Sequence, residues 1–388
     1  MLSKRKTDGR RAARGALVSL LTAVLLAGCD AAPASSAPVQ LRQAFSDADF
    51  AALVDRISER AGYFDTDNLI SNESGYLTVM DALAKTGIEG GAYVGVGPDQ
   101  NFSYIAQVKP TIVFMTDVRR DNMLHHLLLK ALIERAPTRV EFLAGLHGRV
   151  VPPDAAAWQG RSIDAIVEYI DREPVDEAGL SRLHEEIAEE VRAFGILLTQ
   201  EDLGTIQRFH LTFVRAGLGL RFTSYGRASR PYYPTYRQLV LETDIDGDQA
   251  SYLSSAETYG VVRELQLANK IIPVVGDMAG PHAIREMGVV LREMGLQLKA
   301  FYASNVEFYL WRGGTFDEWE ENFASLPVAA DAVIIRSHFP NSGGVHPSAV
   351  RGYYSAQILQ PAATFLRGGF NSYWDAVTRG VLELRVAG

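Results

Sequence analysis

Cysteine is almost absent from this chain of 388 residues, in which the one cysteine is Cys29. A single thiol cannot form an internal disulfide, and it cannot supply the cysteine cluster of a structural zinc site. The sequence also lacks the Gly-Lys-Ser/Thr of a P-loop and the Gly-x-Ser-x-Gly of a nucleophile elbow. Disulfide scaffolds, thiolate metal sites, P-loop nucleotide hydrolysis and α/β-hydrolase chemistry are therefore excluded.

Basic residues are fewer than acidic ones, except near the N-terminus, where they are in excess. The whole chain has a net charge of −8, and residues 1–28 hold six basic residues and one acidic residue. Without them the chain carries 32 basic and 45 acidic residues, a net charge of −13. An acidic protein is poorly suited to general nucleic-acid binding, so we expect no nucleic acid as partner.

The N-terminal segment has the pattern of an export signal. Basic residues precede an apolar run, Ala16 to Ala27, which is too short for a good membrane span. The run ends in Leu26-Ala27-Gly28-Cys29, which resembles the lipobox of bacterial lipoproteins, where the cysteine is lipidated. We expect residues 1–28 to be a signal peptide and residues 29–45 to be a lipidated cysteine with a flexible tether. The protein is then exported and anchored to the cell envelope, with the membrane as its partner.

Beyond the tether, apolar runs alternate with helical patterns over most of the chain. The runs expected to form strands are 92–96, 111–116, 139–146, 270–276, 298–302 and 331–338. Such alternation predicts an α/β fold with a doubly wound, mainly parallel sheet. The alternation stops between about 150 and 240, where helical spacing predicts a mostly helical insertion. We therefore expect N-terminal helices and the first half of the sheet in 46–149, the insertion in 150–240, and the second half of the sheet with the C-terminal region in 241–388.

A glycine-rich turn follows the first of these strands. The run 92–96 leads into Gly97-Pro98-Asp99-Gln100-Asn101, and Asp117 ends the next strand twenty residues after Gly97. Glycines let the backbone approach a ligand closely, and an acid on the neighbouring strand can bind two ribose hydroxyls. This layout predicts a nucleoside-binding site. An ordinary tight turn, with Asp117 capping the next helix, is the alternative.

The arrangement resembles motif I of class I S-adenosylmethionine-dependent methyltransferases. The resemblance implies that Gly95, Gly97, Asp99 and Asn101 line the cofactor, with Asp117 on the ribose. Two positions differ, because Tyr93 stands where those enzymes usually carry an acid and Asp99 replaces the usual third glycine. Three further phrases, Gly95 to Asn101, Val274 to Asp277 and Tyr302 to Glu307, resemble an uncharacterised family of bacterial lipoproteins with a methyltransferase-like fold.

Polar residues also follow the strands of the second half. Asp277 corresponds in order to the acid that methyltransferases place after strand four, near the methyl acceptor. Asn305 and Glu307 follow the strand after it. Ligands of open α/β sheets bind at the carboxyl ends of the strands, so we take Asp277, Asn305 and Glu307 as candidate catalytic residues that align an acceptor. The alternative is that each of these three side chains caps a helix.

Between Leu203 and Leu241 the chain has six arginines and no acidic residue. Arg221, Arg227, Arg230 and Arg237 are interleaved with tyrosines, which predicts a patch for an anionic or sugar-bearing ligand. The alternative is that these arginines pair with acids elsewhere.

We expect no bound metal. Asp244-Ile245-Asp246-Gly247-Asp248 resembles half of a calcium loop, but Gln249 and Ser255 stand where that loop needs glycine and glutamate, so a turn is expected. The adjacent His125 and His126 point about 100° apart on a helix and cannot chelate together. We expect one of them to face the core and the other not.

Three functions remain open at this point. The chain is a methyltransferase-like enzyme that acts on an envelope molecule with S-adenosylmethionine, or a non-catalytic lipoprotein that binds a small nucleoside-like, anionic or sugar ligand. The third hypothesis is a structural lipoprotein that binds a protein partner.

Overall fold

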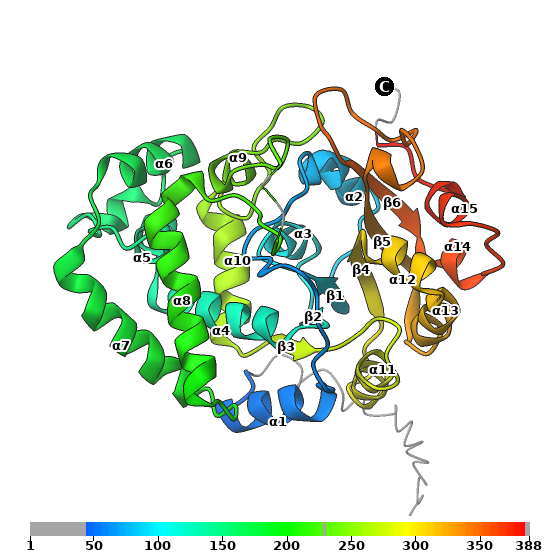
Figure 1. The fold of residues 1–388 in the computed structure, drawn as a ribbon, viewed down its shortest axis with the longest axis horizontal. Helices are drawn as coiled ribbons and strands as arrows, with labels where there is room; N and C mark the ends of the chain where they lie inside the picture. Colours follow the sequence, from blue (N-terminus) through cyan, green and yellow to red (C-terminus); the bar gives the residue numbers. More distant parts are fainter. Residues whose placement is uncertain (1–43, 227, 229, 385–388) are drawn as a thin grey trace, which may run out of the picture. The chain divides into compact units, whose positions relative to one another are not determined.

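A computed structural model describes residues 44–226, 228 and 230–384 of the chain. Within them six strands form one sheet in the order β3-β2-β1-β4-β5-β6 (Figure 1). The strands are β1 (Ala92–Val96), β2 (Ile112–Asp117), β3 (Ile271–Val275), β4 (Leu298–Ser304), β5 (Val328–His338) and β6 (Ala356–Pro361). All neighbouring pairs are parallel except β5 and β6. The predicted α/β class with a mainly parallel sheet is thus confirmed.

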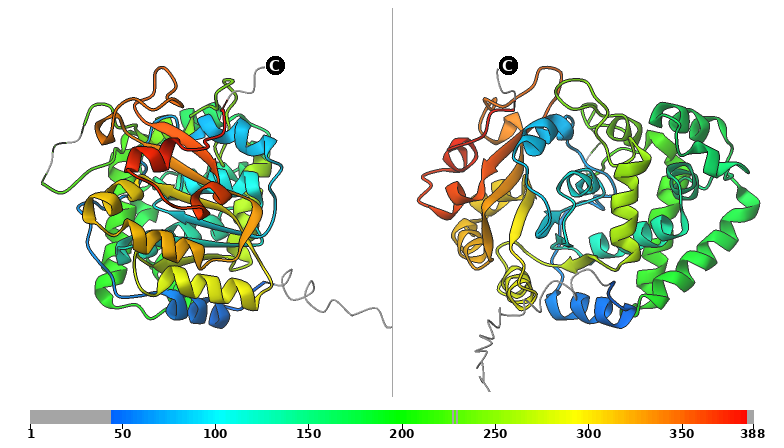
Figure 2. Two further views of the ribbon diagram at one scale, coloured as in Figure 1. Left: turned by 90° about the vertical axis from the view of Figure 1, so that its right-hand side faces the viewer. Right: turned by 180° about the vertical axis from the view of Figure 1, so that it is seen from behind.

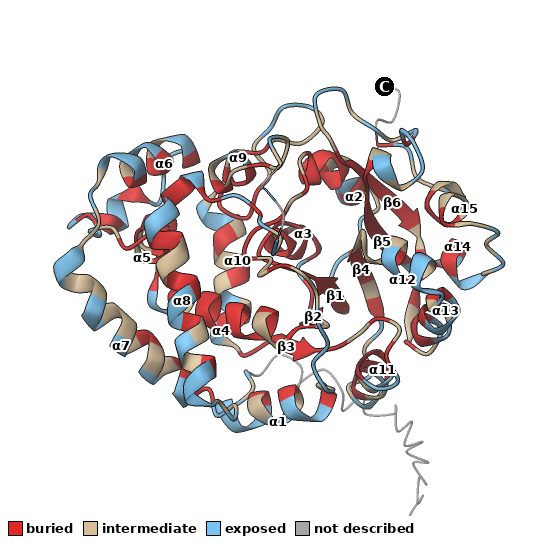
Figure 3. Ribbon diagram, viewed as in Figure 1, coloured by how far each residue is buried: buried red, intermediate tan, exposed pale blue. Residues whose placement is uncertain are grey.

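The centre of the sheet is apolar on both faces. Every residue of β1 is buried, and Val94 pairs with Phe114 of β2 on one side and with Phe301 of β4 on the other. Continuous apolar runs of this kind are typical of parallel strands that are covered by helices on both faces. Figure 3 shows the buried residues gathered along the strands and along the helix faces that meet them.

Helices cover both sides of the sheet, as the three views of Figures 1 and 2 show. On one side lie α3, α4 and α10, with α5 to α8 beyond them, and on the other lie α11, α13 and α14. The helices before β3 are α1 (Asp47–Ile57), α2 (Met80–Lys85), α3 (Asn101–Val108), α4 (Arg120–Arg135), α5 (Arg139–Leu146), α6 (Ile163–Arg172), α7 (Glu177–Ala193), α8 (Gln200–Ala216), α9 (Tyr236–Val240) and α10 (Ala256–Leu267). Those after β3 are α11 (Ala283–Glu293), α12 (Val306–Gly313), α13 (Phe316–Ala324), α14 (Ala362–Leu366) and α15 (Tyr373–Thr378). Short 3₁₀ turns are found at 76–79, 155–158, 217–219 and 340–342.

The prediction of a third strand at 139–146 is wrong, because this segment forms helix α5. Thr138 and Glu141 form a capping box, in which the Thr138 side chain accepts from the Glu141 N–H and the Glu141 side chain accepts from the Thr138 N–H. This reciprocal pair satisfies two free donors and starts a helix. The third strand along the chain is instead Ile271–Val275, which pairs with β2.

Between residues 150 and 240 the chain forms α6, α7, α8 and α9, together with two 3₁₀ turns. Helix α8 packs on α4, and α4 in turn packs on β2 and β3. Ile187 and Val191 are the buried residues of α7, whose glutamates form the exposed or half-buried face. These helices therefore lie outside the layer that touches the sheet.

Candidate functional site

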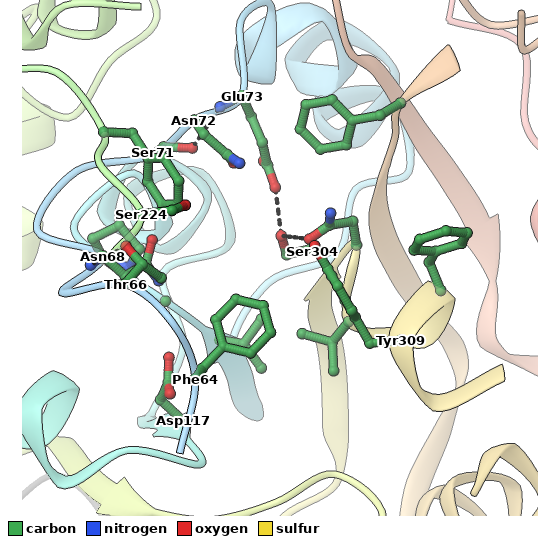
Figure 4. Close-up of a pocket in the computed structure, with 18 of the residues that line it drawn as sticks. Phe64, Thr66, Asn68, Ser71, Asn72, Glu73, Asp117, Ser224, Ser304 and Tyr309 are labelled. Carbon is green, nitrogen blue, oxygen red and sulfur yellow. Dashed lines mark hydrogen bonds between the residues drawn. The ribbon is translucent and has the colours of Figure 1, made fainter. Parts of the chain in front are cut away.

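A cavity of about 330 Å³ opens at the carboxyl ends of the parallel strands. Its floor is formed by Gly97 after β1, Asp117 at the end of β2, Asp277 after β3 and Ser304 at the end of β4. Segments from elsewhere in the chain form its walls, namely 63–73, 222–224, 230–233 and 339–354. Figure 4 shows Asp117 and Glu73 at opposite ends of the group of lining residues, with Phe64 and Tyr309 between them.

The two glycines of the first turn have different surroundings. Gly97 lines the cavity and has a φ of 85°, a conformation that glycine adopts without strain. Its carbonyl oxygen accepts a hydrogen bond from Nε2 of His126 at 2.8 Å. Gly95 lies under the turn, where a Cβ atom would stand 2.0 Å from Oδ1 of Asn101. Gly97 is therefore free to meet a ligand, whereas Gly95 makes room for Asn101.

Asp99 and Asn101, both predicted to line a cofactor, are buried in the protein instead. Asp99 accepts hydrogen bonds from the hydroxyls of Tyr236 and Tyr252, each at 2.9 Å, and burial raises its pKa to about 6. Asn101 donates to the carbonyls of Val96 and Pro98, each at 2.9 Å. Neither residue is among those that line the cavity. Their side chains hold the turn in place, so the structure does not place these two predicted cofactor residues at the cavity.

Tyr93 stands where the class I methyltransferases, whose motif I this turn resembles, usually carry an acid. It is fully buried. Its hydroxyl donates to Oδ1 of Asn101 at 2.8 Å. The residue therefore supports the turn from below and does not reach the cavity. Any acidic group that serves the cavity near β1 must come from another segment.

Asp117 lines the cavity and is paired with Arg119. Its Oδ1 accepts from the backbone N–H of Arg119 at 3.0 Å and from Nε at 2.9 Å, and its Oδ2 accepts from Nη2 at 2.5 Å. Arg119 also donates to the carbonyl of Thr66. A carboxylate oxygen has more than one lone pair, so Asp117 keeps acceptor capacity toward the cavity while Arg119 fixes its orientation.

Asp277 and Asn305 also line the cavity. Asp277 follows β3, so the prediction that it follows the fourth strand is wrong, because the segment expected to be strand three is helix α5. Its Oδ1 accepts from the N–H of Ala279 at 2.9 Å, and its own N–H donates to Glu59 at 2.6 Å. The residue thus shapes a turn while its carboxylate stays at the cavity.

Glu307, predicted as a group that aligns an acceptor, does not line the cavity. Its carboxylate is 1% exposed and pairs with Arg336 of β5, whose side chain is also 1% exposed. Nε1 of Trp319 donates to the same carboxylate at 2.8 Å. This closed ion pair belongs to the core between β5 and helices α12 and α13.

Glu73 is a lining residue that the sequence did not single out. It is 1% exposed and accepts hydrogen bonds from the hydroxyls of Tyr302 and Ser304 of β4. Burial raises the pKa of Glu73 above its ordinary value. The only signal in the sequence was the polar stretch Asp65 to Tyr76 ahead of β1, and nothing in that stretch showed which side chain would be buried.

The predicted arginine patch is dispersed over the surface. Arg230 lines the cavity and donates to the hydroxyl of Tyr232, but Arg237 pairs with Asp171 and Arg221 donates to the carbonyl of Tyr233. Arg227 lies outside the described residues. Of the three described members of the patch, Arg230 is the one that lines the cavity.

The described residues contain no group of three or more His, Asp or Glu side chains placed to hold a metal ion. Asp244 forms a turn in which its Oδ1 accepts from the N–H groups of Asp246 and Asp248. His125 and His126 are both buried, so the expectation that only one faces the core is wrong. The reason is that α4 lies between the sheet and α7, α8 and α10, which leaves it no free face.

The predicted signal peptide 1–28 and the lipidation site Cys29 lie outside the described residues. In the part of the chain that the structure describes, none of the helices combines the length and the apolar character needed to cross a membrane.

A family model described as "Domain of unknown function (DUF7790)" matches residues 68–151 and 211–368, which include all six strands. The matched ranges contain Gly97, Asp117 and Glu73, and they leave out α6 and α7. No curated protein matches the chain. The chain therefore belongs to the family of proteins with this domain of unknown function.

Proposed function

We propose that the chain is a membrane-anchored bacterial lipoprotein with a methyltransferase-like, doubly wound Rossmann-type fold that binds a nucleoside cofactor, S-adenosylmethionine. We further propose that it methylates a molecule of the cell envelope. The observation that carries the binding proposal is that one cavity is lined by both Gly97 and Asp117, the glycine and the acid of the predicted nucleoside site.

The strand order supports a Rossmann-type fold. From β1 the chain builds outward to β2 and β3, and then returns to add β4, β5 and β6 on the other side of β1. Ligands of such sheets bind where the order reverses, at the carboxyl ends of the strands. Gly97 after β1 and Ser304 at the end of β4 mark this place, and both line the cavity.

The lining residues fit a nucleoside. A Cβ on Gly97 would lie 3.3 Å from Asn68 and 3.9 Å from Gln100, so the glycine keeps the turn bare toward the cavity. Asp117 offers acceptors for ribose hydroxyls, and the aromatic rings of Phe64 and Phe222 offer faces for a base. The cavity volume of about 330 Å³ falls within the range of roughly 300 to 1,000 Å³ for small-molecule sites.

S-adenosylmethionine supplies a methyl group on a sulfonium ion. The chain's own contribution is alignment, because a bound acceptor in the correct position needs little further help from acids or bases. Asp277 and Asn305 at the cavity wall would orient the acceptor. The signal-like sequence that ends in Cys29 supports an envelope location, and a cytoplasmic cofactor would then be loaded before export.

Calorimetry of the purified full chain in detergent tests the proposal. We expect S-adenosylmethionine or S-adenosylhomocysteine to bind with a Kd below about 1 mM, and Asp117→Asn to weaken this binding at least about tenfold. Asp202→Asn is the matched control. Asp202 forms a bidentate ion pair with Arg120, as Asp117 does with Arg119, but it lies outside the cavity. A Kd above about 1 mM for both nucleosides would contradict the proposal.

A second candidate function is supported by Arg230. This guanidinium lines the cavity beside the stacked rings of Tyr232 and Tyr354, whose centroids are 3.8 Å apart. Such a group suits an anionic or sugar-bearing ligand in a lipoprotein without catalytic activity. This function predicts no change in the unfolding temperature with either nucleoside.

A further inference from the structure

One wall of the cavity carries a carboxylate that the proposed function leaves unused. Glu73 reaches into the cavity from the segment ahead of β1 and lies against Ser304 at the end of β4 (Figure 4). The side chains that donate to it, from Tyr302 and Ser304, are both neutral. Among the described residues, no Lys or Arg forms an ion pair with Glu73.

A buried carboxylate without a cation is costly, because neutral donors replace only part of its lost hydration. Burial accordingly raises the pKa of Glu73. A positively charged ligand at the cavity wall would offset this cost, whereas an anionic group there would add to it.

A second acceptor, on another lining residue, has no hydrogen-bond partner among the described residues. Gln100 is 5% exposed and lines the cavity, and this acceptor is its Oε1. Its Nε2 lies 3.2 Å from the hydroxyl oxygen of Tyr302, which in turn donates to Glu73. Because the Tyr302 proton is directed to Glu73, its oxygen accepts from Nε2, and this chain of bonds leaves Oε1 of Gln100 as the free end. A donor from a ligand would satisfy this buried acceptor.

Aromatic side chains form much of the remaining wall. Phe64 and Tyr309 face the space between Glu73 and Asp117 (Figure 4), and their ring centroids are 5.1 Å apart. Aromatic faces attract cations that have lost their hydration. The carboxylate, the free amide oxygen and the aromatic wall therefore favour the same kind of group, a cation that carries N–H donors.

We propose that the cavity binds a protonated amine, whose ammonium group lies between Glu73 and Gln100. This inference rests on the proposed function for the rest of the ligand. The ammonium group belongs either to the amino-acid end of the nucleoside cofactor or to a separate amine that serves as substrate.

Four probes separate these sources when they are titrated into the full chain by calorimetry. S-adenosylhomocysteine carries the ammonium group, and 5′-methylthioadenosine lacks the whole amino-acid end. Phenethylamine carries an ammonium group beside an aromatic ring, and 2-phenylethanol is its neutral counterpart. The last pair is titrated both without and with saturating 5′-methylthioadenosine.

Glu73→Gln keeps the size of the side chain and removes its charge, and Gln100→Met removes the free acceptor. Glu242→Gln is the matched control, because Glu242 is also buried, accepts a hydrogen bond from the Gly75 N–H at 3.2 Å and lies outside the cavity lining. Thermal unfolding establishes that each variant is folded. Gln100→Met keeps the test available if Glu73→Gln does not fold.

We expect the wild type to bind at least one ammonium-bearing probe about tenfold more tightly than its partner without that group. Glu73→Gln should abolish this preference, Gln100→Met should reduce it about threefold to tenfold, and Glu242→Gln should leave it unchanged. A preference confined to S-adenosylhomocysteine assigns the site to the cofactor, and a preference for phenethylamine assigns it to a substrate amine.

Two results would overturn the inference: no preference for an ammonium probe in the wild type, or a preference that survives both Glu73→Gln and Gln100→Met. The failure of the proposed function looks different. In that case neither nucleoside binds, while phenethylamine still binds in a manner that depends on Glu73.

Discussion

Two buried glutamates lie on opposite sides of the same part of the sheet and have opposite surroundings. In the closed core, Glu307 is paired with Arg336 and bonded by Trp319. At the cavity, Glu73 is equally buried, at 1% exposed, and its donors among the described residues are neutral. The comparison teaches that burial alone does not mark a functional residue. What distinguishes the cavity is polar capacity that the protein itself leaves unused.

The largest expected effect on stability comes from breaking the buried ion pair between Glu307 and Arg336. Arg336→Leu leaves the Glu307 charge buried without its partner, and such losses typically lower the free energy of unfolding by about 3 to 5 kcal/mol. The double variant Glu307→Gln with Arg336→Met removes both charges and should regain about half of that loss. Chemical denaturation measures both, and equal stability of the single and double variants would contradict the assignment of Glu307 to the core.

The two glycines of the first turn sharpen the comparison next. Gly95→Ala places a methyl group 2.0 Å from Oδ1 of Asn101, and overpacking of this kind costs about 1 to 3 kcal/mol. Gly97→Ala faces the cavity and meets Asn68 only at 3.3 Å, so its cost is the positive φ, about 1 kcal/mol. Chemical denaturation should show that Gly95→Ala is the less stable of the two variants. Calorimetry should show that Gly97→Ala weakens nucleoside binding by more than its small loss of stability would explain.

A third difference concerns how the stability of the fold depends on pH, and it arises in the helices that pack on α4. His125 of α4 is fully buried against α8, both of its ring nitrogens lack partners among the described residues, and burial lowers its pKa well below 6.5. The folded state therefore keeps this ring neutral, while the unfolded chain binds a proton below pH 6.5, so stability is lost as the pH falls.

His125→Phe keeps an aromatic ring against Phe213 and removes the titration. Between pH 7 and pH 5 the variant should lose about 2 kcal/mol less stability than the wild type. His282→Phe is the control for the loss of a histidine from the exposed surface. An identical pH dependence of the His125 variant and the wild type would show that His125 is protonated in the folded state.

The smallest expected effect is on stability at the cavity itself. Glu73→Gln removes a buried charge that has no cation, so we expect the free energy of unfolding to change by less than about 1 kcal/mol, in either direction. Glu307→Gln measured beside it should be several times more costly, because Arg336 then loses its partner. Similar losses for the two variants would remove the distinction between the two regions.

The sequence was informative where function depends on neighbours in the chain. The strand before Gly97, the turn itself and the acid at position 117 are all local patterns, and both residues line the cavity. The wrong prediction of a strand at 139–146 also concerns a local pattern. The Thr138–Glu141 capping box is visible in the sequence, and it outweighs the apolar run.

The other differences depend on residues far apart in the sequence. Glu307 is neutralised by Arg336 on another strand, and Asp99 is buried by Tyr236 and Tyr252 from the segment between α8 and α10. Glu73 is selected among the polar residues of its stretch by contacts with β4. No spacing rule connects such partners, so a single sequence could not show which of these acids faces a ligand.

The reversal of the last strand has a consequence for how this site can change over time. Since β6 runs against β5, His338 pairs with Ala356 and the link between them, residues 339–355, stays at the edge where the strands end. Four of its residues, Phe339, Asn341, Ser342 and Tyr354, face the cavity. Residues 339–355 are thus a connecting loop between two antiparallel strands. Its length and composition can change in evolution, so that the cavity accepts a different ligand while the sheet keeps its structure.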